Sequence, residues 1–266
     1  MEKLTKYNQK LLAIIGTTIV GGAALVLIIG VGGLIISAID FGGGADNGIQ
    51  IRNNPTGQTD STEIIRTQAI TFNSPIQLDT AQAKFIIPVG HVNLESEERI
   101  KIESGGGIKY SSSEYRYDSY YGLYNNFIFY DYQSDFKAKI FNTKIAITHW
   151  SYLRIDSNEL LLFKGTKNDI NSDNQLDHSD YQSLFIYYIS DKKLVEYDFK
   201  NSTVLEFEPM PKTNLISIKV GIDKDIDLEY ESRSEPQEIM ALDVRTRKIN
   251  ELISEKMKEE IQNKID

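Results

Sequence analysis

Hydrophobic and polar positions between residues 64 and 244 follow the short, turn-bounded pattern of β-strands. Runs rich in β-branched and aromatic residues each end in turn residues, as in AKFIIPV, NNFIFYDY, ELLLFKG, SLFIYYI and LISIKVGI. No helical period interrupts these runs. The pattern predicts a mainly β protein with a multi-strand β-domain over residues 63–248.

The period changes at the C-terminus. The apolar residues of the last segment recur at helical spacing and fall on one face, namely Ile249, Leu252, Ile253, Met257, Ile261 and Ile265. We therefore expect a short amphipathic helix over residues 249–266. We expect it to pack on its own domain or fray rather than to bind a partner.

A long uncharged segment lies near the N-terminus. Residues 11–39 read LLAIIGTTIVGGAALVLIIGVGGLIISAI, and about 20 apolar residues suffice to cross a bilayer as a helix. A cleaved signal peptide is the alternative, but its apolar region is usually about 7 to 15 residues long. The segment predicts an uncleaved transmembrane anchor helix in contact with membrane lipid.

Flanking charges predict how this anchor is oriented. Three lysines precede it within residues 1–10, whereas Asp40 and Asp46 follow it and the first cation after it is Arg52. The positive-inside rule then places residues 1–10 in the cytoplasm as a tail and the rest outside. Residues 40–62 are rich in Gly, Asn and Thr and predict a flexible linker. The chain is expected to be a single-pass protein of the cell membrane whose C-terminal domain is extracytoplasmic, and periplasmic in a Gram-negative cell.

Similar segments recur in the β-domain about 55 residues apart. NELLLFKG at 158–165 corresponds to NLISIKVG at 214–221, and each precedes an acid-rich loop. SLFIYYISDKKL at 183–194 likewise corresponds to EIMALDVRTRKI at 238–249, and NFIFYDYQSDFKAKI gives an earlier copy. The spacing predicts a repeated unit of strand, loop, strand, turn and strand.

This unit resembles the blades of TolB-like β-propellers of bacterial envelopes, over residues 127–250. The resemblance implies stacked blades, but a closed propeller needs about four of them and only about three units fit here. An incomplete or atypical propeller, a sandwich, and one part of a larger assembly stay open as alternatives.

Composition narrows the classes of partner and chemistry. The net charge of −9 argues against nucleic acid as a partner, and the absence of cysteine excludes disulfides and thiolate metal sites. Motifs such as G-x-S-x-G, the P-loop and H-x-x-x-H are missing. No catalytic residues are therefore assigned, and we expect a protein without enzymatic activity.

An acidic loop carries the clearest candidate chemistry. In the stretch NDINSDNQLDHSD, oxygen-bearing residues stand at positions 1, 3, 5, 7, 9 and 12 of an EF-hand-like calcium loop, where position 7 contributes its backbone carbonyl. The candidate calcium ligands are Asp169, Asn171, Asp173, Gln175, Asp177 and Asp180. A solvated acidic turn is the alternative.

Two positions depart from the usual calcium loop. Position 6, normally glycine, is Asn174, the residue that best replaces glycine in the left-handed region. Position 12, normally glutamate, is Asp180, which resembles the loops of dockerins. Position 8 is Leu176, where an apolar anchor is expected.

The corresponding loop of the next unit is DKDIDLEYES. Asp223, Asp225 and Asp227 match positions 1, 3 and 5 and form a possible second metal site. The alternation of acids with Ile226 and Leu228 favours a solvated strand face instead.

Together these features predict a non-enzymatic binding or scaffold module anchored in the membrane, with a weak calcium site. An accessory subunit bound to another membrane protein in a larger complex is the main alternative. A carboxylate-based glycan hydrolase is a third, because the chain offers many carboxylate pairs.

Overall fold

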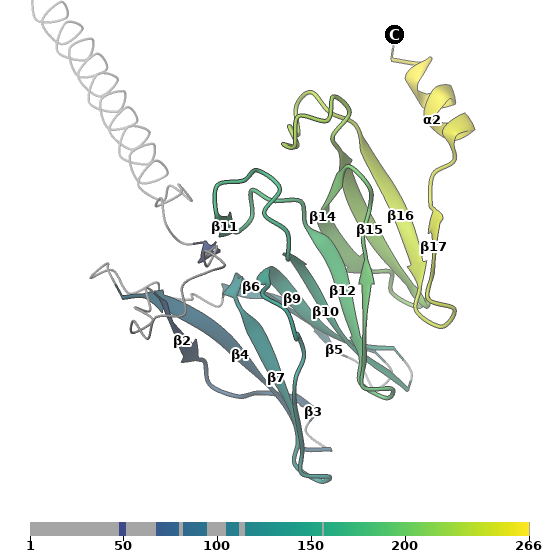
Figure 1. Ribbon diagram of the computed structural model, residues 1–266. Coiled ribbons are helices and arrows are strands. Elements are labelled where there is room, and N and C mark those ends of the chain that lie inside the picture. Colours follow the sequence, from purple (N-terminus) through teal and green to yellow (C-terminus); the bar gives the residue numbers. More distant parts are fainter. Residues whose placement is uncertain are drawn as a thin grey trace, which may run out of the picture. The chain divides into compact units, whose positions relative to one another are not determined.

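The computed structural model describes residues 48–51, 68–79, 82–94, 105–111, 115–155 and 157–265. The described residues belong to one compact unit that begins at Gly48, and they are shown in colour in Figure 1. The predicted cytoplasmic tail, the anchor at 11–39 and most of the predicted linker lie outside the described residues.

The described chain is mainly β, as predicted, and its strands pair antiparallel into three larger sheets. The first sheet has the order β2-β4-β7-β8, and β3 also pairs with β4. Its strands are β2 (Gln68–Phe72), β3 (Ile76–Asp79), β4 (Lys84–Asn93), β7 (Asn126–Asp131) and β8 (Phe136–Lys139).

The central sheet has the order β13-β12-β10-β9-β6-β5. Its strands are β5 (Gly105–Ser111), β6 (Tyr115–Tyr124), β9 (Ala146–Ile155), β10 (Asn158–Thr166), β12 (Ser183–Tyr188) and β13 (Lys193–Tyr197). The third sheet consists of β14 (Ser202–Pro209), β15 (Leu215–Ile222), β16 (Gln237–Asp243) and β17 (Lys248–Glu251), in that order.

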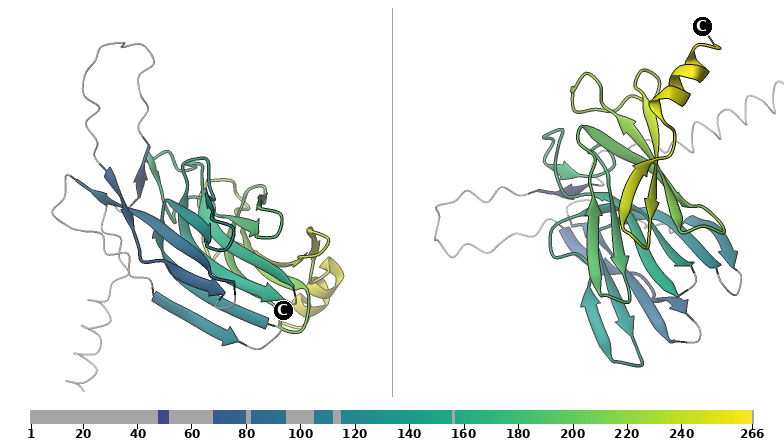
Figure 2. Two further views of the ribbon diagram at one scale, coloured as in Figure 1. Left: turned by 90° about the horizontal axis from the view of Figure 1, so that it is seen from below. Right: turned by 90° about the vertical axis from the view of Figure 1, so that its right-hand side faces the viewer.

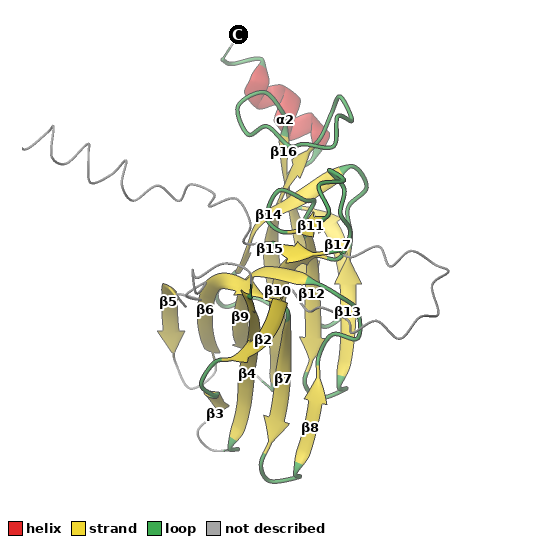
Figure 3. Cartoon of the chain, turned by 60° about the vertical axis from the view of Figure 1, so that its left-hand side comes forward, coloured by secondary structure: helices red, strands yellow, loops and turns green. Residues whose placement is uncertain are grey.

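The three sheets stack as successive layers, with the central sheet between the other two (Figures 2 and 3). One core lies between the first and central sheets and includes Phe127, Trp150 and Phe163. A second core lies between the central and third sheets and includes Leu162 and Phe207. The described sheets do not close into a propeller ring.

This layering explains the near-continuous apolar runs of the central strands. In β10, Leu161 and Phe163 belong to the first core, whereas Leu160 and Leu162 belong to the second. A strand that is buried on both faces has no solvated side, so every position can be apolar. Burying each such side chain stabilises the fold by about 1.5–3 kcal/mol.

Two short elements differ from the sequence expectations. β1 (Ile49–Gln50) lies inside the predicted linker and pairs with β11 (Gln175–Leu176), because Ile49 is buried against Leu176 and Ala146. The C-terminal helix α2 (Glu255–Gln262) begins six residues later than predicted, since Lys248–Glu251 extends the third sheet as β17 and Ser254 caps the helix. Within the described residues, no helix is long and apolar enough to span a membrane.

The segments that resemble one another lie on corresponding strands. NELLLFKG forms most of β10 and NLISIKVG most of β15, and each strand pairs with the strand that follows its acidic loop. Each acidic loop therefore connects two strands that pair with each other. The repeat itself stays a prediction from the sequence.

Candidate metal centre

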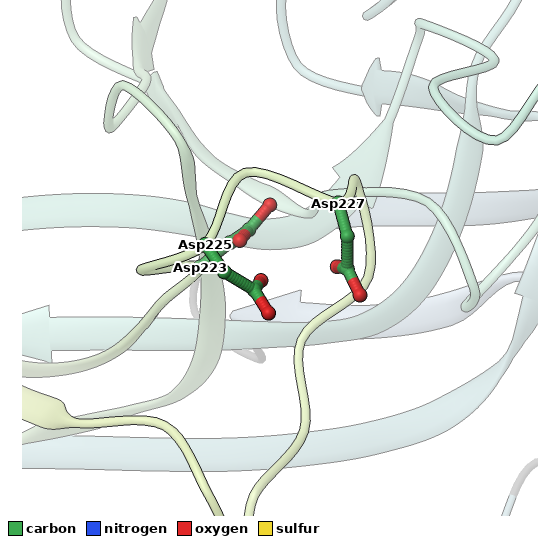
Figure 4. Close-up of side chains that lie close together, drawn as sticks. All are labelled: Asp223, Asp225 and Asp227. Atoms are coloured by element: carbon green, nitrogen blue, oxygen red, sulfur yellow. The ribbon is translucent and has the colours of Figure 1, made fainter.

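Three aspartates converge in the loop between β15 and β16. One carboxylate oxygen each of Asp223, Asp225 and Asp227 lies within 4.8 Å of the other two. Figure 4 shows the three side chains side by side in this loop. Asp223 is buried and the other two are exposed. In the part of the chain that the structure describes, these three residues form the one cluster of acidic or histidine side chains close enough to share an ion.

Hydrogen bonds from the backbone to Asp223 produce this convergence. Its carboxylate accepts from the amides of Ile226 at 2.6 Å and Leu228 at 3.0 Å. Both donors have left-handed backbones, with φ of 61° and 76°, a conformation that bulky residues rarely adopt. The chain therefore curls around Asp223, and one oxygen each of Asp225 and Asp227 lies near its carboxylate.

The expectation of a solvated strand over this segment is wrong. The alternation of acidic and apolar residues is compatible with a strand, but β15 ends at Ile222 and β16 begins only at Gln237. Side-chain oxygens that bond nearby amides compete with strand pairing. Here Asp223 and Asp227 both do so, since Asp227 accepts from the amide of Glu229 at 3.0 Å.

Asp223 and Asp225 lie in different electrostatic environments. The phenol of Tyr181 donates a hydrogen bond to Asp223 and lowers the pKa of that carboxyl. At Asp225, desolvation and the neighbouring charges of Asp227 and Glu235 raise the pKa. A bound cation would relieve this repulsion, and hard carboxylate oxygens suit calcium.

In the acidic loop at 169–180, side-chain oxygens accept hydrogen bonds from backbone amides of the same loop. Asp169 accepts from the amides of Asp173 and Asn174 at 3.2 and 3.0 Å. Asp180 is buried and accepts from Ile170 at 2.7 Å and Asp177 at 3.2 Å. These bonds hold the loop tightly curled, and its calcium ligation stays a prediction.

Other candidate ligands in this loop make similar contacts. Asn171 accepts from the amide of Asp173 at 3.1 Å, and Asp173 accepts from that of Gln175 at 2.8 Å. Asp177 accepts from the amide of Ser179 at 2.8 Å. The side chains of Asn171 and Ser179 also bond each other at 2.9 Å, so the two ends of the loop meet.

The two acidic loops share a backbone conformation. Ser172 and Asn174 have φ of 62° and 67°, in the positions that Ile226 and Leu228 occupy in the other loop. In each loop the first aspartate accepts from the amide five residues later, at 3.0 Å in both cases. The prediction that Asn174 replaces glycine in the left-handed region is confirmed.

The expected apolar anchor of the first loop is also present. Leu176 is 1% exposed and packs against Ile49 and Ala146. The backbone around it pairs with β1, and Ile51 donates a further bond to the carbonyl of Asn174 at 2.8 Å. The loop is therefore fixed to the domain at its middle as well as at its ends.

A pocket of about 380 Å³ lies between the two loops. Its wall includes Asp180, Tyr181 and Tyr230, together with Lys164 of β10. The Lys164 ammonium donates to the carbonyl of Leu205 at 2.8 Å, and burial lowers its pKa. Tyr181, Tyr230 and Lys164 could not be predicted from the sequence, because only the stacking of the sheets brings these residues together.

Among the described residues, no histidine belongs to the cluster of Asp223, Asp225 and Asp227. His149 is buried between the rings of Tyr121 and Phe207, and its Nε2 lies 2.7 Å from the Ser119 hydroxyl. Burial, helped by the charge of Lys164, lowers the pKa of His149 to about 3. Ser119 is buried too, so this Ser–His pair is closed to solvent.

No protein-family model matches the chain, and no curated protein is similar to it in sequence. The site is therefore interpreted from its own geometry. That geometry offers three carboxylates close together in one loop, a donor set that suits a hard divalent cation.

Proposed function

We propose that the protein is a membrane-anchored, extracytoplasmic, non-enzymatic binding or scaffold module that holds calcium at Asp223, Asp225 and Asp227. The observation that carries the proposal is the convergence of these carboxylates within 4.8 Å. Residues 11–39 supply the anchor, and the charges on either side of it give the orientation.

Calcium fits this donor set better than zinc or magnesium. Zinc prefers thiolate and imidazole ligands, whereas this cluster offers carboxylates only. Magnesium demands a near-ideal octahedron, while calcium accepts six to eight oxygens in flexible geometry, with water and backbone carbonyls completing the shell. A site with three side-chain ligands and two exposed members belongs to the weak extracellular range, with Kd of about 10⁻⁴ to 10⁻³ M.

Calcium would stabilise the conformation of the loops that border the pocket. The Asp223 loop and the Asp169 loop border the same pocket, and Tyr181 connects them. An ion at Asp223 would hold the left-handed backbone of Ile226 and Leu228 in place. The pocket wall at Tyr230 would then be ordered for a ligand.

An accessory role in a larger membrane complex is the second candidate. The observation that favours it is the exposure of Ile70 and Phe72, at 65% and 60%, on one face of the first sheet. Apolar side chains in such a position commonly mark a contact with another protein.

Thermal unfolding of the full chain in mild detergent tests the calcium proposal. At ten times Kd, calcium should add about 1.4 kcal/mol to the free energy of unfolding, a rise of roughly 3–6 °C in Tm. Magnesium at the same concentration should do much less. The Asp225→Asn/Asp227→Asn variant should lose the shift and the Glu251→Gln control should keep it; an unchanged shift in the first variant would refute the site.

A further inference from the structure

The pocket between the two acidic loops has an aromatic part and a polar part. Two tyrosines line it, namely Tyr181, directly after the first loop, and Tyr230, within the second loop. Its polar lining includes Lys164, Thr203 and Glu229. Its volume is about 380 Å³, and pockets that bind small molecules measure about 300–1,000 Å³. The pocket therefore has the size and the mixed lining of a small-molecule site.

The ring of Tyr230 is held from behind by Gly221 of β15. A Cβ atom at Gly221 would lie 2.6 Å from two atoms of this ring and 2.8 Å from a third. Such similar distances to three neighbouring ring atoms mean that the glycine contacts the face of the ring and not its edge. The Tyr230 phenol also accepts a hydrogen bond from Gln237 Nε2 at 2.7 Å. The ring is thus fixed in the pocket wall, and any side chain at Gly221 would displace it.

Tyr181 is fixed in a similar way, through the hydrogen bond from its phenol to Asp223. Because the phenols of Tyr181 and Tyr230 both bond other residues of the protein, these tyrosines add chiefly ring surface to the pocket wall. Tyrosine rings supply a large contact area at low cost in conformational entropy. A ring that is already immobilised loses still less entropy when a ligand binds. The pocket therefore offers preorganised aromatic surface.

Beside these rings, the pocket offers both hydrogen-bond donors and acceptors. Lys164 is partly buried in β10, and among the described residues its ammonium bonds the carbonyl of Leu205 at 2.8 Å. An ammonium group has three donors, so donor capacity is left for a ligand. Glu229 comes from the second acidic loop, is exposed, and offers a carboxylate that accepts hydrogen bonds.

The charges around the pocket favour an uncharged ligand. An anion would be repelled by Asp180, by Glu229 and by the aspartates of both loops, whereas a cation would be repelled by Lys164. Hydroxyl groups both donate and accept hydrogen bonds. A neutral molecule with several hydroxyl groups can therefore donate to Glu229 and accept from Lys164 at the same time.

We propose that this pocket binds uncharged pyranose residues of a glycan, with one face of the sugar on the ring of Tyr230 and its hydroxyl groups bonded to Lys164 and Glu229. A pyranose has a flat face of C–H groups and a rim of hydroxyl groups, so it matches aromatic surface beside polar groups. The proposal names the ligand class of the binding module proposed above and rests on that function.

A ligand-observed NMR titration of the full chain tests the ligand class, with calcium present and in a detergent without a sugar headgroup. The probes are maltose, cellobiose and N,N′-diacetylchitobiose, and at least one of them should bind. Deacetylated chitobiose, which is cationic, should bind more weakly than its acetylated form. Failure of all three neutral sugars, or preference for the cationic one, would overturn the proposal. The calcium-dependent rise in Tm is measured on the same sample, so loss of sugar binding alone would leave the calcium site intact.

Substitutions around Tyr230 test where the sugar binds. Tyr230→Leu removes the ring and should weaken binding about tenfold or more, which corresponds to 1.4 kcal/mol. Gly221→Ala should weaken it too, because it displaces the same ring. Tyr230→Phe keeps the ring and should keep binding, as should Tyr132→Leu, which alters a tyrosine that is 66% exposed outside the pocket. Thermal unfolding shows that each variant is folded. Equal affinities of the unmodified chain and Tyr230→Leu would overturn the proposed site.

Discussion

The phenol of Tyr181 donates a hydrogen bond to the carboxylate of Asp223, and so connects the end of one acidic loop to the start of the other. The two residues are 42 positions apart in the chain and belong to loops of different sheets. Asp223 also accepts from the amides of Ile226 and Leu228. One buried carboxylate therefore organises its own loop and fixes it to the neighbouring sheet.

Replacement of Tyr181 by Phe should destabilise the protein while leaving its packing nearly unchanged. A hydrogen bond to a charged group contributes about 1.5–3 kcal/mol, so Tm should fall by roughly 3–10 °C. The pKa of Asp223 should rise, because the Tyr181 hydrogen bond is the main cause of its lowered value. Thermal unfolding at neutral pH measures the first effect. Tyr132→Phe, at a residue that is 66% exposed, is the control; equal Tm values for the two variants would count against this connection.

His149 should make stability depend on pH on the acidic side of neutrality. Its pKa is about 3 in the folded protein and about 6.5 in an unfolded chain. Between these values the unfolded state binds the proton and the folded state does not. The free energy of unfolding should therefore fall as pH falls below about 6.5, by at most about 1.4 kcal/mol per pH unit.

Thermal unfolding between pH 6.5 and 5 separates the effect of His149 from that of most carboxylates, because ordinary carboxyl groups titrate below this range. His149→Phe keeps an aromatic ring between Tyr121 and Phe207 and should flatten the dependence. His178→Gln alters a side chain that is 80% exposed and should preserve it. Parallel curves for the unmodified protein and His149→Phe would show that another group is responsible.

Sequence patterning predicted strands wherever both faces of a strand are apolar. β10 and β12 illustrate this, because their continuous apolar runs follow from burial between two cores. The pairing of β1 with β11 could not be predicted, since it depends on a contact between Ile49 and Leu176, far apart in the chain. The start of α2 was also predicted too early. Ile249 fits the helical period, but it belongs to β17, where it lies opposite Leu242 of β16.

The candidate ligands were found from spacing, but their convergence was not predictable from it. Both acidic loops match the first positions of a calcium loop, yet only Asp223, Asp225 and Asp227 come together among the described residues. Both loops have a left-handed backbone at the third and fifth residues after the first aspartate, so this feature does not distinguish them. At Ile226 and Leu228 residue preferences argue against that conformation, and hydrogen bonds to Asp223 stabilise it.

The proposed membrane topology predicts which residues can be labelled from outside the cell. The Lys256 side chain is 86% exposed on α2, so a cysteine at this position would be accessible. In intact spheroplasts, a membrane-impermeant maleimide should label Lys256→Cys at once and Lys6→Cys only after permeabilisation. The reverse order of labelling would place the β-domain in the cytoplasm.

Equilibrium dialysis of the full chain against radioactive calcium tests the central claim most directly. We expect binding with Kd of about 10⁻⁴ to 10⁻³ M, lost in Asp225→Asn/Asp227→Asn and kept in Glu251→Gln. Calcium binding by the Asp169→Asn/Asp173→Asn variant shows whether the first acidic loop binds a second ion. Undiminished binding in Asp225→Asn/Asp227→Asn, or no binding by the unmodified chain, would contradict a calcium site at Asp223, Asp225 and Asp227.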